Sequence, residues 1–107
     1  MNISEFQELM RNLYLHRDQA RGIPGTFTWF VEEVGELAHE LRQVMTSPRD
    51  ESVPASLKHL EDEFADVFAW LCSLANLAGI DLERAATGKY PGTCSKCGNH
   101  PCTCTHD

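Results

Sequence analysis

Two acidic clusters, each in the middle of a long amphipathic segment, most constrain what this chain folds into. The first acidic cluster is Glu32, Glu33 and Glu36, and the second is Glu63 and Asp66. Residues three positions apart share one face of an α-helix, and two antiparallel helices that face each other would bring the clusters together. Carboxylates gathered in this way repel one another. We therefore expect a hard divalent cation, Mg²⁺ or Mn²⁺, to bind there through oxygen ligands.

Apolar residues recur at helical spacing along most of the chain and predict an all-α fold. We expect a first helix over residues 2–20, a second over 26–45 and a third over about 55–78. A short fourth helix should run from Asp81 to about Ala86. We expect these helices to pack as an antiparallel bundle that oligomerisation completes, because they carry more apolar surface than one small core can cover.

Glycine, proline and capping residues mark the predicted ends of the helices. Residues 22–25 read Gly-Ile-Pro-Gly and should separate the first helix from the second, and residues 46–56 form a polar connector with two prolines. Gly79 is expected to end the third helix in a left-handed conformation. Ser4 and Asp81 are the predicted N-caps of the first and fourth helices.

The apolar stripes of the second and third helices place both acidic clusters at the same edge of the predicted core. Trp29 lies on the carboxylate side, four residues before Glu33, and Trp70 lies four residues after Asp66. Each tryptophan either packs against a neighbouring helix or subunit or lines a ligand pocket, and both interpretations stay open. The stripes consist of Phe27, Phe30, Val31, Val34, Leu37, Ala38, Leu41 and Val44 in the second helix, and Leu57, Leu60, Phe64, Val67, Phe68, Leu71, Leu74, Ala75 and Ala78 in the third.

A solvated surface is the alternative interpretation of the acidic clusters. Few cations stand nearby to balance the charge, since the second helix offers only Arg42 and the third only Lys58. Unbalanced like charges at this spacing destabilise a helix unless something binds them, so the residues alone weigh the two interpretations about equally. The charged end of the first helix, with Arg17 and Arg21, is interpreted as a solvated last turn, the alternative being a contact with phosphate.

Composition and charge narrow the class of protein. The chain has 107 residues, of which 42% are hydrophobic and 23% charged, as expected for one small globular domain. Its formal net charge of -7 argues against direct binding of nucleic acid, which requires a basic surface. No apolar run reaches the length of a membrane span, and no signal peptide is apparent. We therefore expect no membrane partner and a cytoplasmic location.

Four of the five cysteines lie close together near the C-terminus, in the spacing C-x2-C-x4-C-x-C. Such clustering is more typical of a metal site than of a disulfide framework. Four thiolates suit a structural Zn²⁺ ion, and Gly98 allows the tight turn of a zinc knuckle; a flexible reduced tail is the alternative. The isolated Cys72 is predicted to be a small buried apolar residue. We thus divide the chain into a helical domain, residues 1–92, and a Cys-rich tail, residues 93–107. The four clustered residues are Cys94, Cys97, Cys102 and Cys104.

The order of the acidic residues resembles one enzyme family. Glu-Glu-x-x-Glu at 32–36 followed by Glu-x-x-Asp at 63–66 is similar to the MazG-like branch of the all-α nucleoside triphosphate pyrophosphohydrolases. Residues 77–82, Leu-Ala-Gly-Ile-Asp-Leu, and residues 89–91, Lys-Tyr-Pro, also resemble the closing segments of that family. The resemblance covers about residues 3–92.

The resemblance implies a Mg²⁺-dependent hydrolase that cleaves nucleoside triphosphates between the α- and β-phosphates to give a monophosphate and pyrophosphate. Lys89 matches a basic residue of the family and would contact phosphate, while Trp29 or Trp70 would stack on the base, unless both only pack. Family members form dimers or tetramers with the site near the subunit interface, so a homodimer or homotetramer is expected. Carried over by position, the metal ligands would be Glu33, Glu36, Glu63 and Asp66, and Glu32 would hold a further metal or orient the attacking water.

Base and sugar preference cannot be inferred from these residues. A dUTP- or dCTP-selective pyrophosphatase and a phosphoribosyl-ATP pyrophosphatase are the nearest enzymatic alternatives, because all would use the same carboxylates. A non-catalytic helical module whose zinc tail binds a partner is an alternative from another class. Metal-dependent release of pyrophosphate distinguishes the enzymes from the module.

Overall fold

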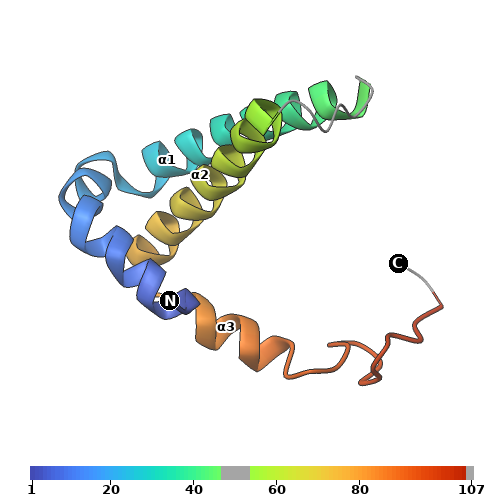
Figure 1. The fold of residues 1–107 in the computed structure, drawn as a ribbon. Coiled ribbons are helices and arrows are strands. Elements are labelled where there is room, and N and C mark those ends of the chain that lie inside the picture. The colour runs from blue at the N-terminus through green and yellow to red at the C-terminus, as the bar shows by residue number, and fades with distance from the viewer. Residues whose placement is uncertain (47–53, 106–107) are drawn as a thin grey trace.

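The computed structural model describes residues 1–46 and 54–105, which contain three helices and no strand. The predicted all-α fold is therefore confirmed, while most of the predicted connector lies outside the described residues. No single described helix is long and apolar enough to cross a membrane, although one bent pair of helices meets that test by length and composition only. Figure 1 shows the helices, which are α1 (Ile3–Thr46), α2 (Pro54–Ala78) and α3 (Leu82–Lys89).

Helix α1 consists of two helical arms that meet at Gly22. The backbone of Gly22 has φ 73° and ψ 177°, a conformation outside the helical region that is almost restricted to glycine. Pro24 comes two residues later, at the start of the second arm, where a missing N–H group breaks no helical hydrogen bond. The predicted break at residues 22–25 is thus present as a sharp bend that turns the chain back on itself (Figure 1).

Both arms of α1 contact α2. In the first arm, the ring of Phe6 stacks on Phe68 with 5.2 Å between centroids. In the second arm, Trp29 stacks on Trp70 with 5.8 Å between centroids. Because of the bend, α1 contacts α2 with both of its arms. We call α1 and α2 together the helical unit.

Asn2, rather than Ser4, caps the start of α1. The backbone N–H of Glu5 donates to Asn2 Oδ1 at 2.8 Å, and the backbone N–H of Asn2 donates to Glu5 Oε1 at 3.1 Å. This reciprocal pair is a capping box. The prediction for Ser4 was wrong, since its hydroxyl donates instead to Asp81 Oδ1 at 3.1 Å and ties the first arm to the start of α3.

Gly79 ends α2 as predicted. It adopts φ 70°, and its N–H donates to the carbonyl of Asn76 at 3.4 Å. The N–H of Ile80 donates to the carbonyl of Ala75 at 2.9 Å. The two bonds form a Schellman motif, which satisfies carbonyls that the helix end leaves free.

Asp81 caps α3 as predicted, because its carboxylate accepts from the N–H groups of Glu83 and Arg84. The helix continues past Ala86, where we expected it to end, as far as Lys89. The N–H of the next residue donates to the carbonyl of Ala86 at 2.8 Å and closes the last turn. The predicted boundary was therefore too early.

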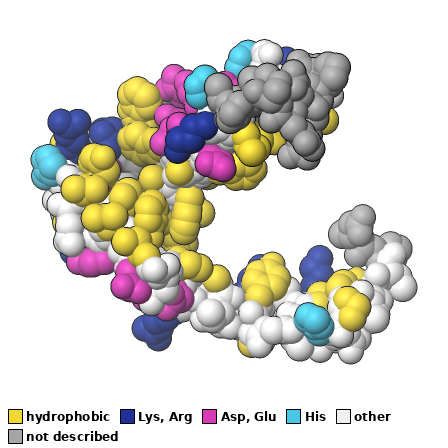
Figure 2. Space-filling model, in the orientation of Figure 1, with side chains coloured by type: hydrophobic (Ala, Val, Ile, Leu, Met, Phe, Trp, Pro, Cys, Tyr) yellow, Lys and Arg dark blue, Asp and Glu magenta, His cyan; other side chains and the backbone are white. Residues whose placement is uncertain are grey.

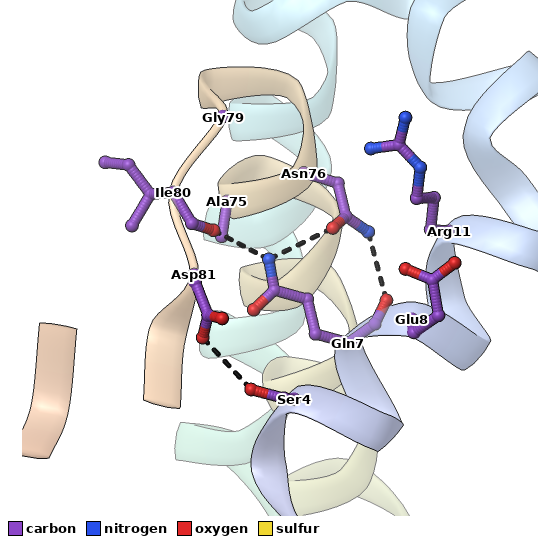
Figure 3. A pocket seen from close by; sticks show the side chains of 9 residues that line it. All are labelled: Ser4, Gln7, Glu8, Arg11, Ala75, Asn76, Gly79, Ile80 and Asp81. Carbon is purple, nitrogen blue, oxygen red and sulfur yellow. Dashed lines mark hydrogen bonds between the residues drawn. The ribbon is translucent and has the colours of Figure 1, made fainter. Parts of the chain in front are cut away.

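Gln7 joins the three helices at one point, shown in Figure 3. Its Nε2 donates to Asn76 Oδ1 at 3.0 Å and to the carbonyl of Ile80 at 2.7 Å, and its Oε1 accepts from the N–H of Leu82 at 2.9 Å. A cavity of about 280 Å³ adjoins this network. Because the central amides bond to each other and to backbone, we interpret the cavity as part of a structural junction.

The described part of the chain buries few apolar side chains. Cys72 is fully buried, as predicted, and Met10 and Ala75 are nearly so. The predicted core stripes are only partly covered, since Phe27 is 54% exposed and Phe64 is 53% exposed. The stripes are thus incompletely buried in one chain, and completion of the core by oligomerisation stays a prediction.

The shape of the molecule agrees with this incomplete core. The Cα radius of gyration is 16.9 Å, whereas about 13 Å is expected for a compact domain of this length. Figure 2 shows hydrophobic side chains gathered on the hollow inner side of the molecule, between the helical unit and α3. One chain therefore leaves a broad apolar surface open.

Candidate metal centre and its adjoining cavity

Three carboxylates meet between the second arm of α1 and α2. Glu33 and Glu36 lie one turn apart on α1, and Glu63 faces them from α2. One oxygen from each of the three residues lies within 4.8 Å of the others. The structure thus brings together three of the four side chains expected to bind a metal, and we call them the carboxylate group.

Like charges crowd the carboxylate group. Burial raises the pKa of Glu33, and the charges of Asp66 and Glu36 raise it further. Burial and then the charge of Glu36 raise the pKa of Glu63. Lys58, a cation that the sequence offered as a counter-charge, bonds instead to Asp62 at 2.9 Å.

The oxygen atoms of this group suit a divalent cation. Glu33 Oε2 and Glu63 Oε2 are both buried and have no hydrogen-bond partner among the described residues. A buried carboxylate oxygen without a partner is costly, and a cation shared between converging oxygens removes that cost. Carboxylate oxygens alone, without nitrogen or sulfur, are the ligand set of Mg²⁺ and Mn²⁺.

Asp66 and Glu32 lie at the edge of the carboxylate group. The charge of Asp66 raises the pKa of both Glu33 and Glu63, and its side chain is exposed. The charge of Glu32, also exposed, acts on Glu33. Neither belongs to the set of oxygens within 4.8 Å of one another.

Glu40 is a neighbour of the site that the sequence analysis missed. It is half-buried, and its charge also raises the pKa of Glu63. Glu40 lies four residues after Glu36, so the same helical spacing that defined the first acidic cluster could have included it.

Trp29 and Trp70 pack on each other beside the carboxylate group. Their rings are 5.8 Å apart and nearly parallel, at 7°. Trp70 also lines a cavity of about 250 Å³, which Trp29 does not. The packing interpretation thus holds for both rings, and Trp70 in addition faces an open space. The cavity beside Trp70 is lined by Met10, Tyr14, Arg17, Asp18, Arg21, Asp66, Ala69, Trp70 and Ser73.

An ion pair from the first arm of α1 forms one wall of this cavity. Arg21 Nη2 bonds to Asp18 Oδ1 at 2.6 Å, and the guanidinium carbon lies 4.8 Å from the centroid of the Trp70 ring. Asp18 is fully buried, and within the described part of the chain its Oδ2 has no hydrogen-bond partner. The predicted solvated last turn was therefore wrong for Asp18, because the bend at Gly22 folds this turn onto α2.

Lys89 is the last residue of α3, and its ammonium lies 5.6 Å from the centroid of the Tyr90 ring. It does not line the cavity beside Trp70. Helix α3 starts at the end of α2 and leads away from the middle of that helix (Figure 1). Within one chain, the structure does not bring Lys89 to the carboxylate group.

The profile of the MazG nucleotide pyrophosphohydrolase domain matches residues 24–97, which is more than half of the chain. The protein belongs to the MazG family. The match includes the second arm of α1, all of α2 and α3, and both acidic clusters, but not the first arm with Asp18 and Arg21. No curated protein matches the chain. Membership in the MazG family supports nucleotide pyrophosphohydrolase activity in general, with a divalent metal.

Four of the five cysteines of this MazG-family chain form a second cluster, in the tail that follows α3. The N–H groups of Thr103 and Asn99 lower the pKa of Cys97 to about 6. Hydrogen bonding to Cys102 and other thiols raises the pKa of Cys104 to about 11. The candidate ligand atoms of the cysteine cluster are all sulfur, whereas those of the carboxylate group are all oxygen.

Proposed function

We propose that the protein hydrolyses nucleoside or deoxynucleoside triphosphates to a monophosphate and pyrophosphate, with Mg²⁺ or Mn²⁺ as cofactor. The observation that carries the proposal is the carboxylate group: one oxygen of each residue lies within 4.8 Å of the others, and Glu33 and Glu63 each have a buried oxygen without a hydrogen-bond partner in the described residues. Its place inside the segment matched by the MazG family supports the same conclusion.

Glu33, Glu36 and Glu63 would hold the metal, with Asp66 completing the ligand set from the next turn of α2. The bound ion supplies positive charge for the phosphates and lowers the pKa of a bound water. These carboxylates contribute by fixing the position of the ion, which the rigid packing of two helices maintains.

Glu32 is the carboxylate that we assign to the attacking water. Its side chain is exposed and stands beside Glu33, outside the carboxylate group. It is therefore free to accept a proton without giving up a metal bond.

The cavity beside Trp70 would receive the nucleotide. Trp70 lines the cavity, with Trp29 stacked on its ring and the Arg21 guanidinium over it, and would contact the base from this wall. Arg17 lines the cavity and would face the phosphates. Lys89 would contact phosphate only if it comes from another subunit or if α3 moves, because it lies away from the cavity in one chain.

The test is to measure pyrophosphate release by the full chain from a panel of ribonucleoside and deoxyribonucleoside triphosphates, with Mg²⁺, with Mn²⁺ and with EDTA. We expect metal-dependent formation of monophosphate and pyrophosphate in equal amounts. Inclusion of dUTP, dCTP and phosphoribosyl-ATP separates the enzymatic alternatives from one another.

Two results would contradict the proposal. Release of orthophosphate with a nucleoside diphosphate would show cleavage at the wrong bond. Absence of turnover for every nucleotide with either metal would favour the non-catalytic helical module instead.

A further inference from the structure

The four clustered cysteines of the tail form a compact sulfur site outside the proposed active site. Their four Sγ atoms lie within 4.8 Å of one another, and none of the four thiols is in a disulfide bond. Cys94 Sγ and Cys104 Sγ are 3.7 Å apart. A Zn–S bond of about 2.3 Å implies sulfur atoms about 3.8 Å apart at the corners of a tetrahedron. The observed separation thus fits a metal site, and it is far longer than the bond of about 2.05 Å in a disulfide.

Backbone N–H groups point at three of the four sulfur atoms. Lys96 N donates to Cys94 Sγ at 3.5 Å, and Thr103 N donates to Cys97 Sγ at 3.4 Å. The N–H of Cys104 donates to Cys102 Sγ at 3.3 Å. Donors in these positions stabilise negative charge on sulfur, which is the form that binds a metal.

The tail is folded around its sulfur atoms by its own hydrogen bonds. Gly98 N donates to the carbonyl of Cys94, and Cys94 N donates to the carbonyl of Asn99, both at 2.9 Å. Gly98 has φ 74°, which permits the tight turn. Asn99 Nδ2 donates to Thr103 Oγ1 at 2.7 Å and joins the first half of the site to the second.

We propose that Cys94, Cys97, Cys102 and Cys104 bind one Zn²⁺ ion as a closed structural site. Thiolates are soft ligands that favour Zn²⁺ over Mg²⁺, so the tail and the carboxylate group select different metals. Four sulfur ligands fill a tetrahedral ion and leave no position for water or substrate. His100 is exposed and does not belong to the cluster, and His106 lies outside the described residues.

The ion supplies the free energy that folds this segment. Residues 93–105 contain no helix and no buried side chain, so no apolar core holds them. In a small site of this kind, metal binding and folding are one event. The zinc-bound tail is therefore expected to stay ordered independently of substrate and of Mg²⁺.

The test is metal analysis of the full chain, purified under reducing conditions, by inductively coupled plasma mass spectrometry. We expect about one zinc per chain. Replacement of zinc by Co²⁺ should give intense absorption from charge transfer between thiolate and cobalt, with the visible bands of a tetrahedral ion.

Matched variants locate the metal. Cys97→Ser and Cys104→Ser should each lose most of the zinc and the cobalt charge-transfer band. Cys72→Ala removes a thiol outside the tail and should keep one zinc, as should Glu36→Gln, which changes the carboxylate group. Metal-dependent pyrophosphate release should persist in Cys97→Ser, so a failure of the zinc proposal stays distinct from a failure of the proposed activity.

Three outcomes would overturn the zinc site. The first is that the reduced full chain contains no zinc and gives no cobalt charge-transfer band. The second is that both tail variants keep full zinc. The third is that thiol alkylation shows a Cys94–Cys104 disulfide that forms without metal. The last outcome would mark the tail as a redox pair.

Discussion

Glu36 and Asp66 are the two exposed carboxylates among the expected metal ligands, so amide substitutions there disturb little packing. We expect Glu36→Gln and Asp66→Asn each to lower Mg²⁺-dependent pyrophosphate release by more than about 100-fold, the upper end of the effect of losing a supporting group at a metal site. Stability should be unchanged or increased, because each change removes one of several repelling charges. Initial rates and thermal unfolding measure the two effects.

Glu61→Gln is the matched control, since Glu61 is an exposed glutamate of α2 outside the carboxylate group. It should retain normal rates. Full activity in both Glu36→Gln and Asp66→Asn would remove the metal assignment.

The raised pKa of Glu33 predicts a dependence of stability on pH in the metal-free protein. Because its pKa in the folded chain lies above its ordinary value of 4.5, folding favours the protonated form. The contribution of Glu33 to stability is therefore present below pH 4.5 and is lost as pH rises through the folded pKa. In EDTA, Glu33→Gln should stabilise the protein at neutral pH, and this gain should vanish as pH falls toward 4.5.

Denaturant unfolding of both proteins across this pH range measures the difference. Excess Mg²⁺ should abolish or reverse the gain, because the ion binds the ionised carboxylate. A constant difference between the two proteins at all pH values would contradict the origin of the effect in Glu33 ionisation.

At the scale of the elements, the bend of α1 decides which groups line the cavity. Gly22 adopts φ 73°, and an L-residue in this region costs on the order of 1–3 kcal/mol. We expect Gly22→Ala to destabilise the protein by that amount and to weaken substrate binding, because Asp18 and Arg21 would move relative to Trp70. Denaturant unfolding and the KM for the best nucleotide check the two effects.

Gly88→Ala is the control, since Gly88 lies inside α3 and an added Cβ meets no atom within 4 Å. It should be neutral or stabilise the protein by up to about 1 kcal/mol. Equal effects of the two substitutions would show that the bend does not depend on glycine.

At the scale of the whole molecule, the open apolar surface predicts a homo-oligomer. Phe27, Val31 and Val34 on α1 and Phe64 and Leu71 on α2 are all exposed in one chain. Surfaces of this kind are usually covered by another subunit. We expect light scattering at micromolar concentration to give at least twice the chain mass of 12.0 kDa. A monomer of 12.0 kDa at that concentration would contradict this expectation.

The local features of the fold followed from the sequence. The bend at Gly22, the C-terminal motif of Gly79 and the cap by Asp81 depend on residues within about five positions, where hydrogen bonds and backbone preferences act. The helical period and one antiparallel pair of helices were enough to predict that Glu33 and Glu36 lie close to Glu63. Local patterns erred where two caps competed, as with Ser4 and the nearby Asn2.

The tertiary structure alone decided the surroundings of the carboxylate group. Asp18 is buried and Arg21 lies over Trp70 because the bend in α1 brings the first arm onto α2, and no periodic pattern encodes that crossing. The exposure of Phe64 likewise depends on which side of α2 one chain can cover. Helical period determines which side chains share a face, whereas burial depends on what the rest of the chain places against that face.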